Sequence, residues 1–398
     1  MAEPEVLVSK TALIHNLKLL QQHAQARALF PVLKANAYGH GISLVAPFLE
    51  TQLGPEQCPY FCVARVSEAR ELRAIGVKRP VLVLSFFSLS DFHSAEGFPS
   101  DTALVINSLS EMAELLSLSA AQLRCLNGIH LNFNTGMNRL GFSYKNFPEF
   151  CGELMSLVSQ LHLQGVVVRG LMTHFASAEI DIDSNNFQKQ RFHHIVSELR
   201  SVWKDAQHGS FPRWLHIENS AALCQNFGLQ SATAARPGLH LWGYSLWKKS
   251  LGFKPALSVR APLRQIFSVA KGDAVGYGLP YLCSRESLVG TVPLGYADGV
   301  SRRLSRAEVG DSFSGFVVNG VRVPTIGKVS MDLCVIDLTD HPEAPSLRKG
   351  AAHATTAYWI CPQQTADDLA QSLNTISYEI LCRLDHRLPR RWKEESKL

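Results

Sequence analysis

The sequence predicts an α/β protein in which a (β/α)8 barrel of the TIM type is followed by a mainly β C-terminal domain. Between residues 30 and 245, eight short apolar runs alternate with stretches of helical pattern. Such continuous runs are typical of parallel strands that are buried on both faces. After residue 246, turn signals become frequent, as in a β domain. We therefore predict a barrel over residues 1–246 and a second domain over residues 247–398.

The eight runs give the order of the predicted barrel strands. They are Phe30–Leu33, Phe61–Ala64, Val81–Leu84, Ala103–Ile106, Ile129–Phe133, Val166–Met172, Trp214–Ile217 and Leu239–Trp242. A doubly wound open sheet is the competing architecture, but the Gly-rich fingerprint expected after its first strand is missing.

Helix signals separate these runs. Ser67 is placed to cap a helix that ends at Gly76, and Ser108 with Glu111 forms an S-x-x-E capping box. A longer helix is indicated by apolar residues on one face, at Phe192, Ile195, Val196 and Leu199. In the second domain, Asn319-Gly320 lies between two valine-rich segments and predicts a type I′ hairpin.

Composition narrows the class of protein. The chain has 398 residues, 46% of them hydrophobic, and a net charge of +5, which is too weak and too scattered to indicate a nucleic-acid partner. No run approaches the ~20 apolar residues that span a bilayer, and MAEPEVLVSK does not resemble a signal peptide. The nine cysteines lack metal or redox spacing. We expect a cytoplasmic protein with no metal and no membrane partner.

The first predicted strand ends in a motif that carries chemistry, Lys34-Ala-Asn-Ala-Tyr38-Gly-His-Gly. A lysine at the carboxyl end of a barrel strand lies where barrel enzymes place their catalytic groups. Partial burial lowers the pKa of an ammonium and makes lysine a usable nucleophile towards an aldehyde. Taken alone, such a lysine is equally well explained as a strand-end residue that reaches solvent.

Further motifs follow in a fixed order along the chain. They are His130-Leu-Asn-Phe-Asn-Thr-Gly-Met-Asn-Arg139, Thr173-His174, His216-Ile-Glu-Asn219-Ser220, Arg236-Pro-Gly238-Leu239, Gly276-Tyr277-Gly278 with Tyr281, Gly295-Tyr296-Ala-Asp-Gly, and Ser330-Met331-Asp332. Together with the lysine motif, this series resembles the motifs of the alanine racemase family. The members of that family are barrel enzymes that depend on pyridoxal 5′-phosphate. The resemblance runs from about residue 30 to the C-terminus.

The resemblance implies how the cofactor is held. Lys34 would carry it as an imine, and Arg139 would contact its phenolic oxygen. Its phosphate would be bound by Tyr38, Ser220 and the backbone amides of Gly238 and Leu239, with Asn219 alongside. The Met331 backbone would hold the substrate carboxylate, and Tyr281 and Tyr296 would line the approach.

The resemblance also implies two bases on opposite faces of the substrate, Lys34 and Tyr277. A hydrogen-bonded relay through His174 towards Arg236 would assist the tyrosine, which is otherwise a weak base near neutrality. Arg236 would face the pyridine nitrogen. Because a guanidinium only donates, that nitrogen would stay unprotonated, which favours reprotonation at Cα over transamination.

Three positions depart from the family pattern. Asn132 stands where many relatives have a lysine that can be carbamylated, so a bound anion or another hydrogen bond must replace that group. Asn134 stands where aspartate is usual. His386 aligns with a gate tyrosine near the phosphate, on the strength of the flanking Arg387-Leu-Pro389-Arg390.

The function implied is that of an alanine racemase, an isomerase that supplies D-alanine for peptidoglycan and works as a homodimer with shared active sites. One alternative is a racemase of the same fold that acts on serine or on several amino acids. Another is a non-catalytic pyridoxal-phosphate-binding protein, but that class has a single barrel without an equivalent of residues 250–398. A barrel-type decarboxylase would need a catalytic cysteine in a known motif.

Overall fold

The computed structural model describes residues 3–246, 251–278, 281–305 and 315–394. The chain divides into two compact units, each of which is described by itself. The barrel unit comprises His15–Ala37 and Val45–Leu241, and the sheet unit comprises Met1–Ile14, Tyr38–Leu44 and Trp242–Leu398. The predicted boundary between residues 246 and 247 stays a prediction, because residues 247–250 lie outside the described residues. The division into units assigns two N-terminal segments, residues 1–14 and 38–44, to the sheet unit.

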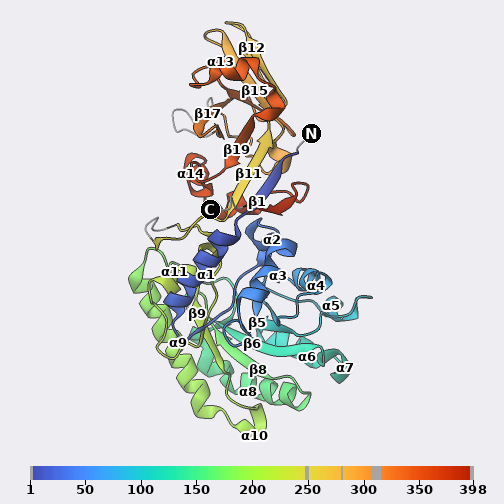
Figure 1. Ribbon diagram of the computed structural model, residues 1–398. Coiled ribbons are helices and arrows are strands. Elements are labelled where there is room, and N and C mark those ends of the chain that lie inside the picture. The colour runs from blue at the N-terminus through green and yellow to red at the C-terminus, as the bar shows by residue number, and fades with distance from the viewer. Residues whose placement is uncertain (1–2, 247–250, 279–280, 306–314, 395–398) are drawn as a thin grey trace. The chain divides into compact units, whose positions relative to one another are not determined.

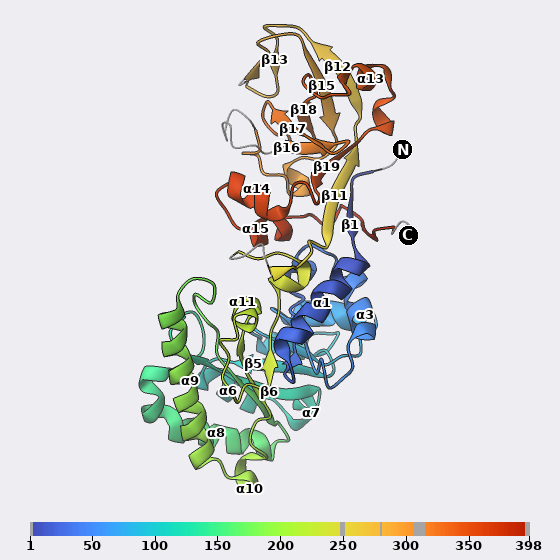
Figure 2. The ribbon, with the colours of Figure 1, turned by 60° about the vertical axis from the view of Figure 1, so that its left-hand side comes forward.

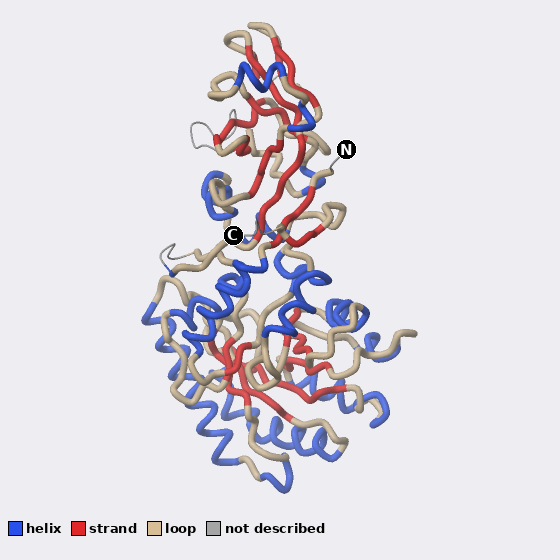
Figure 3. The backbone as a smooth tube through the Cα atoms, in the orientation of Figure 1, coloured by secondary structure: helices blue, strands red, loops and turns tan. Residues whose placement is uncertain are grey.

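Eight parallel strands form the barrel among the described residues (Figures 1 and 3). Their sheet order is β2-β10-β9-β8-β6-β5-β4-β3, and the short β7 (Phe142–Ser143) pairs with β6. The ring closes through the segment after β2, where Phe30 N donates to Ala235 O at 2.8 Å and Leu33 N donates to Cys62 O at 2.7 Å. The predicted parallel barrel is confirmed. The strands are β2 (Ala28–Leu29), β3 (Phe61–Val63), β4 (Val81–Val83), β5 (Thr102–Ile106), β6 (Leu126–Asn134), β8 (Val168–Met172), β9 (Trp214–Glu218) and β10 (Ala234–Ala235).

Helices follow the strands along the chain, and the predicted helix face is confirmed in α9, where Phe192, Ile195, Val196 and Leu199 are buried. α6 begins at Ser108, whose Oγ accepts from Glu111 N at 3.2 Å. None of the helices in the described ranges combines the length and the apolar character needed to cross a bilayer. The helices are α1 (Lys10–Ala24), α3 (Ile42–Gln52), α4 (Val66–Ala74), α5 (Leu89–His93), α6 (Leu109–Leu116), α7 (Ala120–Leu123), α8 (Phe147–Leu163), α9 (Ile182–Val202), α10 (Asp205–His208) and α11 (Ser220–Cys224).

Two local predictions were wrong. The eighth apolar run, Leu239–Trp242, forms a 3-10 helix (η2), and the eighth strand is the earlier β10. Pro237 offers no N–H to a strand ladder, and Leu241 N donates back to Gly238 O at 2.9 Å. The helix expected to start at Ser67 is capped instead at Arg65, because the Glu68 carboxylate accepts from Arg65 N at 3.1 Å.

The sheet unit is built on nine strands in the order β12-β15-β18-β17-β16-β19-β11-β1-β20 (Figure 2). All neighbours are antiparallel except β1 and β20. The predicted hairpin is confirmed between β16 and β17, with φ values of 45° at Asn319 and 81° at Gly320. The strands are β1 (Glu5–Val8), β11 (Leu257–Pro262), β12 (Gln265–Val269), β15 (Ser287–Val292), β16 (Gly315–Val318), β17 (Val321–Ile326), β18 (Cys334–Asp337), β19 (Thr356–Ile360) and β20 (Arg390–Trp392).

A separate pair, β13 (Ala274–Val275) and β14 (Tyr281–Leu282), extends from this unit. Its base packs on a small apolar cluster that contains Val275, Val289 and Ile326. The helices of the unit are α13 (Ala344–Lys349), α14 (Ala366–Ser372) and α15 (Ser377–Cys382), with the short 3-10 helices η4 (Tyr296–Asp298) and η5 (Ala352–Ala354).

β1 is expected to stabilise a sheet whose other strands lie some 250 residues away in sequence. It pairs with β11 on one side and β20 on the other, and it buries Val6, Leu7 and Val8. At about 1.5–3 kcal/mol for each buried apolar side chain, deletion of residues 1–8 should lower the free energy of unfolding by at least about 3 kcal/mol. Urea unfolding measures this, with deletion of residues 1–4 as the control. Equal midpoints for the two deletions would contradict the role of β1.

Candidate active site

Lys34 follows directly on the ring-closing segment of the barrel, at the start of a turn labelled α2 (Lys34–Tyr38). Ala35, Asn36, Ala37 and Tyr38 have φ values of 52–54°, so four consecutive L-residues adopt the left-handed helical region. This conformation costs roughly 1–2 kcal/mol per residue. It is held by Glu68 Oε1, which accepts from Ala35 N at 2.7 Å. Backbone strain of this kind persists where a structure must fix a functional side chain, here the lysine.

The carboxyl ends of β6, β8, β9 and β10 bring further predicted residues to the same face of the barrel, because the strands are parallel. His174 follows β8, Asn219 and Ser220 follow β9, and Arg236 follows β10 directly. Arg139 lies in the loop after β6 and is exposed. The barrel unit thus gathers the predicted ring- and phosphate-binding residues, except for Tyr38.

Arg236 is the most enclosed charged group of this set, with an exposed fraction of 3%. One terminal nitrogen donates to Nδ1 of His216 at 2.8 Å and to the His216 carbonyl. The other donates to the Thr173 carbonyl at 2.8 Å and lies 3.4 Å from His174 Nδ1. Burial lowers the pKa of Arg236 to about 10, so the side chain still carries its proton at neutral pH.

These bonds fix the tautomers of two histidines. Because Arg236 can only donate, His216 must accept at Nδ1 and carry its proton on Nε2. That proton is donated to Nδ1 of His130 at 2.8 Å, so the neutral His130 ring carries its own proton on Nε2. A chain of hydrogen bonds therefore runs from the guanidinium into the barrel interior.

The histidines around Arg236 are neutral. Burial, and then the charge of nearby arginines, lowers the pKa of His130 and of His174 to about 3. The same causes, burial first and then Arg236, lower the pKa of His216 well below its ordinary value. The guanidinium thus lies beside uncharged rings, of which His216 accepts a hydrogen bond from it and His174 lies at 3.4 Å.

Three of the predicted phosphate-binding residues, Ser220, Gly238 and Leu239, meet at the start of η2. Ser220 Oγ accepts from Gly238 N at 2.7 Å and from His240 N at 3.4 Å. The Leu239 amide lies in the same turn. Asn219 Oδ1 accepts from Ala222 N at 3.0 Å and caps α11, so this side chain orients Ser220. A hydroxyl and successive backbone amides form a donor group suited to an oxyanion.

Asn132, which stands where many relatives have a lysine, takes part in a side-chain hydrogen bond. Its Nδ2 donates to Asn107 Oδ1 at 2.9 Å, and Asn107 Nδ2 donates in turn to Ser85 O at 3.2 Å. Asn134, the other departure, uses Oδ1 to accept from Gly136 N and Asn138 N, which shapes the loop that leads to Arg139.

The remaining predicted residues belong to the sheet unit, and Tyr38 contacts Trp242 and Tyr378 there, with ring centroids 6.0 and 5.7 Å apart. Tyr277 lies in the β13–β14 connection and is 73% exposed. Gly276 beside it has a φ of 85°, and a Cβ at Gly276 would lie 2.9 Å from Lys328 N, so the turn requires glycine. Tyr281 begins β14.

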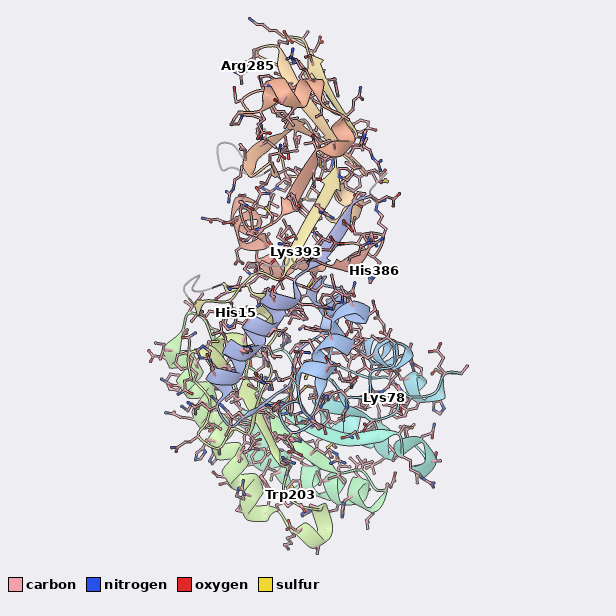
Figure 4. The ribbon with its side chains drawn as sticks, viewed as in Figure 1. His15, Lys78, Trp203, Arg285, His386 and Lys393 are labelled. Atoms are coloured by element: carbon pink, nitrogen blue, oxygen red, sulfur yellow. The ribbon has the colours of Figure 1, made fainter. Side chains whose placement is uncertain are left out.

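Tyr296 and Met331 lie on two loops that are bonded to each other. Tyr296 N donates to Ser330 O, and Ala297 N donates to Met331 O, both at 3.0 Å. The Met331 carbonyl is therefore engaged, and its N–H is the group that suits a carboxylate. His386, labelled in Figure 4, lies in the exposed segment before β20.

Sequence reasoning assigned no role to His130, His216 or Glu68. The two histidines come from strands β6 and β9, 86 residues apart, and only the closed barrel brings them together. One signal was present in the sequence, a glycine within a strand: a Cβ at Gly170 in β8 would lie 2.2 Å from His130 Nδ1. Gly170 thus leaves room for the histidine ring.

Family models match both halves of the chain. The alanine racemase N-terminal domain matches residues 8–246, and the alanine racemase C-terminal domain matches residues 256–392. Alanine racemase 1 of Clostridium acetobutylicum is 32% identical over 382 residues, which is 94% of this chain and 92% of that protein. The alanine racemase of Sorangium cellulosum is 33% identical over 403 residues, covering 97% and 98% of the two chains.

Solved structures agree. The alanine racemase from D-cycloserine-producing Streptomyces lavendulae matches with a TM-score of 0.82 and 26% identity, over 100% of this chain and 98% of that one. The alanine racemase from Bartonella henselae with covalently bound pyridoxal phosphate matches with a TM-score of 0.79 and 25% identity, over 99% and 100%.

The three neutral histidines should make the fold sensitive to mild acid. Unfolding raises each histidine's pKa from its depressed folded value back towards about 6.5. The unfolded chain therefore binds more protons below that pH, and stability falls as the pH decreases, by up to about 1.4 kcal/mol per pH unit for each histidine. Urea unfolding at pH 7.5 and 5.5 measures the loss.

Ring ¹⁵N shifts provide the direct check. His130, His174 and His216 should keep the ring shifts of neutral imidazole at pH 5.5, as they have at pH 7.5. Protonation of His216 in the folded protein at that pH would contradict the assigned hydrogen-bond chain.

Proposed function

Because the chain belongs to the alanine racemase family, we propose that it interconverts L-alanine and D-alanine with pyridoxal 5′-phosphate as its cofactor. Similarity to named alanine racemases over nearly the whole chain carries this proposal. In this proposal the enzyme lies in the cytoplasm, and the D-alanine that it forms is used for peptidoglycan.

The donors of this chain fit the cofactor. The Ser220 hydroxyl and the Leu239 amide are assigned as donors to a phosphate, together with Tyr38. Gly238 N, which donates to Ser220 Oγ here, is assigned to the same group, and Asn219 is the cap that orients Ser220. Arg236 is buried without a carboxylate hydrogen-bonded to it, so it can donate to an unprotonated ring nitrogen. Arg139 is assigned to the phenolic oxygen. When bound, pyridoxal phosphate makes the Cα proton of an attached amino acid acidic.

Lys34 and Tyr277 are assigned as the two bases. Lys34 holds the cofactor and moves the Cα proton of the D-enantiomer, and Tyr277 moves that of the L-enantiomer from the opposite face. His174, neutral and next to Arg236, is assigned to the relay that assists Tyr277. The Met331 N–H holds the substrate carboxylate, and Tyr281 and Tyr296 line the pocket.

Arg236 directs the outcome of the proton transfer. Its neighbours His174 and His216 are neutral, so neither is an imidazolium that could donate a proton to the ring nitrogen. Arg236 would hold the ring nitrogen of the cofactor without a proton, which would weaken the electron withdrawal that the cofactor supplies. Racemisation is thereby favoured over transamination.

The assembly assigned is a homodimer in which the sheet unit of one subunit completes the barrel site of the other. Exposed apolar side chains on the sheet unit support it: Tyr277 is 73%, Leu282 64% and Met331 54% exposed. Large apolar groups gathered beside functional residues are typical of an interface. A two-fold arrangement closes such an assembly.

His386 favours one second candidate, a racemase with activity towards serine. The imidazole of His386 is smaller than the phenol of the tyrosine with which it aligns. One additional methylene or hydroxyl group on a substrate changes the free-energy difference between two substrates by only ~1–3 kcal/mol. Alanine should remain the better substrate. The match of a C-terminal domain to residues 256–392 opposes a single-barrel, non-catalytic protein.

The direct test incubates purified protein and pyridoxal phosphate with a panel of L-amino acids, followed by chiral analysis. D-alanine should form fastest, with D-serine slower. Borohydride reduction and peptide mapping should find the pyridoxyl group on Lys34. A preference for serine, lysine or arginine would overturn the alanine assignment, and label on another lysine would overturn that of Lys34.

Tyr277→Phe separates the two bases. Loss of the phenol should reduce solvent-deuterium exchange into L-alanine by about 100-fold or more, since a positioned general base contributes about 10²–10⁴. Exchange into D-alanine, which depends on Lys34, should fall much less. Equal loss for both enantiomers would refute the two-base assignment.

Hybrid dimers test the shared site. Inactive Lys34→Ala and Tyr277→Phe proteins, mixed under conditions of verified subunit exchange, should recover up to about a quarter of wild-type activity, because one site in a hybrid dimer has both bases. As the control, each variant alone is taken through the same exchange procedure. Absence of recovery would show that one chain builds each site alone.

A further inference from the structure

Arg387 lies where three segments of the sheet unit meet. Its Nε pairs with Asp298 Oδ1 at 2.7 Å, and its terminal nitrogen pairs with Asp332 Oδ1 at 2.9 Å. Asp298 ends the turn that begins with Tyr296, Asp332 follows Met331, and Arg387 itself follows His386. One guanidinium therefore joins the three segments that carry the assigned substrate-facing residues.

The contact with Asp298 is anchored from both sides. Asp298 is 3% exposed, and its second oxygen accepts from Gly295 N at 2.7 Å. Asp385 N donates to Asp298 O at 3.3 Å, which ties the same turn to the C-terminal segment. The two carboxylates together raise the pKa of Arg387, so its charge is constant. The planar fork of arginine can pair with two carboxylates at once, which the point charge of lysine cannot reproduce.

The Tyr296 turn and the Met331 loop contact each other directly through their backbones. A Cβ at Gly295 would lie 2.1 Å from Met331 O, so the two backbones are in direct contact. Movement of the Met331 loop would therefore be transmitted to the Tyr296 turn. Asp332 connects the Met331 loop to Arg387, and the side chain of Asp332 is 60% exposed.

We propose that Arg387 is a positioning residue that sets the substrate pocket, by pinning the Tyr296 and Met331 loops to the segment of His386. The inference rests on the proposed function. Its physical content is that the Met331 N–H is held at the place where a substrate carboxylate binds, and that Tyr296 and His386 are held at a fixed spacing, which limits the size of the substrate side chain.

Asp332→Asn separates positioning from stability. A pair whose carboxylate is this exposed contributes little to folding, so the thermal midpoint should change by less than about 2 °C. Removal of a negative charge near a bound carboxylate would, through charge alone, lower the KM for alanine. Loosening of the Met331 loop raises it. The sign of the change in KM thus distinguishes the two effects.

The experiment compares the holoenzymes of wild type, Asp332→Asn, Arg387→Lys and the double variant. Arg383→Gln is the matched control, because it removes the arginine of an exposed ion pair with Glu379 just before this segment. Asp332→Asn should raise the KM for L-alanine about tenfold, with kcat within about twofold, and should narrow the preference for alanine over serine. Arg387→Lys should raise the KM for L-alanine at least as much. The KM of the double variant should not exceed that of Arg387→Lys.

Hydrogen exchange gives a readout that is independent of turnover. The amides of residues 330–333 should exchange faster in Asp332→Asn than in the wild type, and at the wild-type rate in Arg383→Gln. An unchanged or lower KM in Asp332→Asn, or additive effects in the double variant, would overturn the clamp while leaving the racemase assignment intact. A wild type that racemises no alanine would instead overturn the proposed function.

Discussion

A buried guanidinium that must only donate is the constraint on which the barrel site depends. Arg236 is almost fully enclosed, and its hydrogen bonds go to two backbone carbonyls and to the ring of His216, with His174 next to it. A carboxylate in this position would offset the charge more cheaply, but it would also compete for the guanidinium. Neutral acceptors satisfy the donors and leave the charge to act on a ligand. The histidine tautomers follow from this one requirement.

The sequence predicted the barrel and most of its strands because a buried parallel strand is a continuous apolar run, as β3, β4 and β5 show. It located Lys34 for the same reason, at the end of such a run. It could not predict the left-handed turn after Lys34. Only Asn36 of its four residues favours positive φ, and the turn depends on Glu68, which lies 33 residues from Ala35. The η2 segment is apolar and buried like a strand, and only Pro237 with Ser220 makes it a helix.

The site residues divide along similar lines. Motif resemblance identifies the residues that are proposed to contact a ligand, whereas the groups that orient them are identified only by their contacts in the structure. His130 and Asn107 act through His216 and Asn132, at separations of 86 and 25 residues. Likewise, β1 is a four-residue strand with three apolar residues whose partners are β11 and β20, and its apolar run resembles that of a barrel strand. Pairing over such distances is a property of the closed fold.

The exchange of charged for neutral groups near the end of β6 has an electrostatic consequence. A carbamylated lysine would bring a negative charge near Arg139, whereas Asn132 and Asn107 form a neutral pair in which both residues are buried. Burying two amides that bond each other costs far less than burying an anion, so the chain keeps a fixed geometry here without a modification. It also leaves the charge of Arg139 uncompensated by that anion.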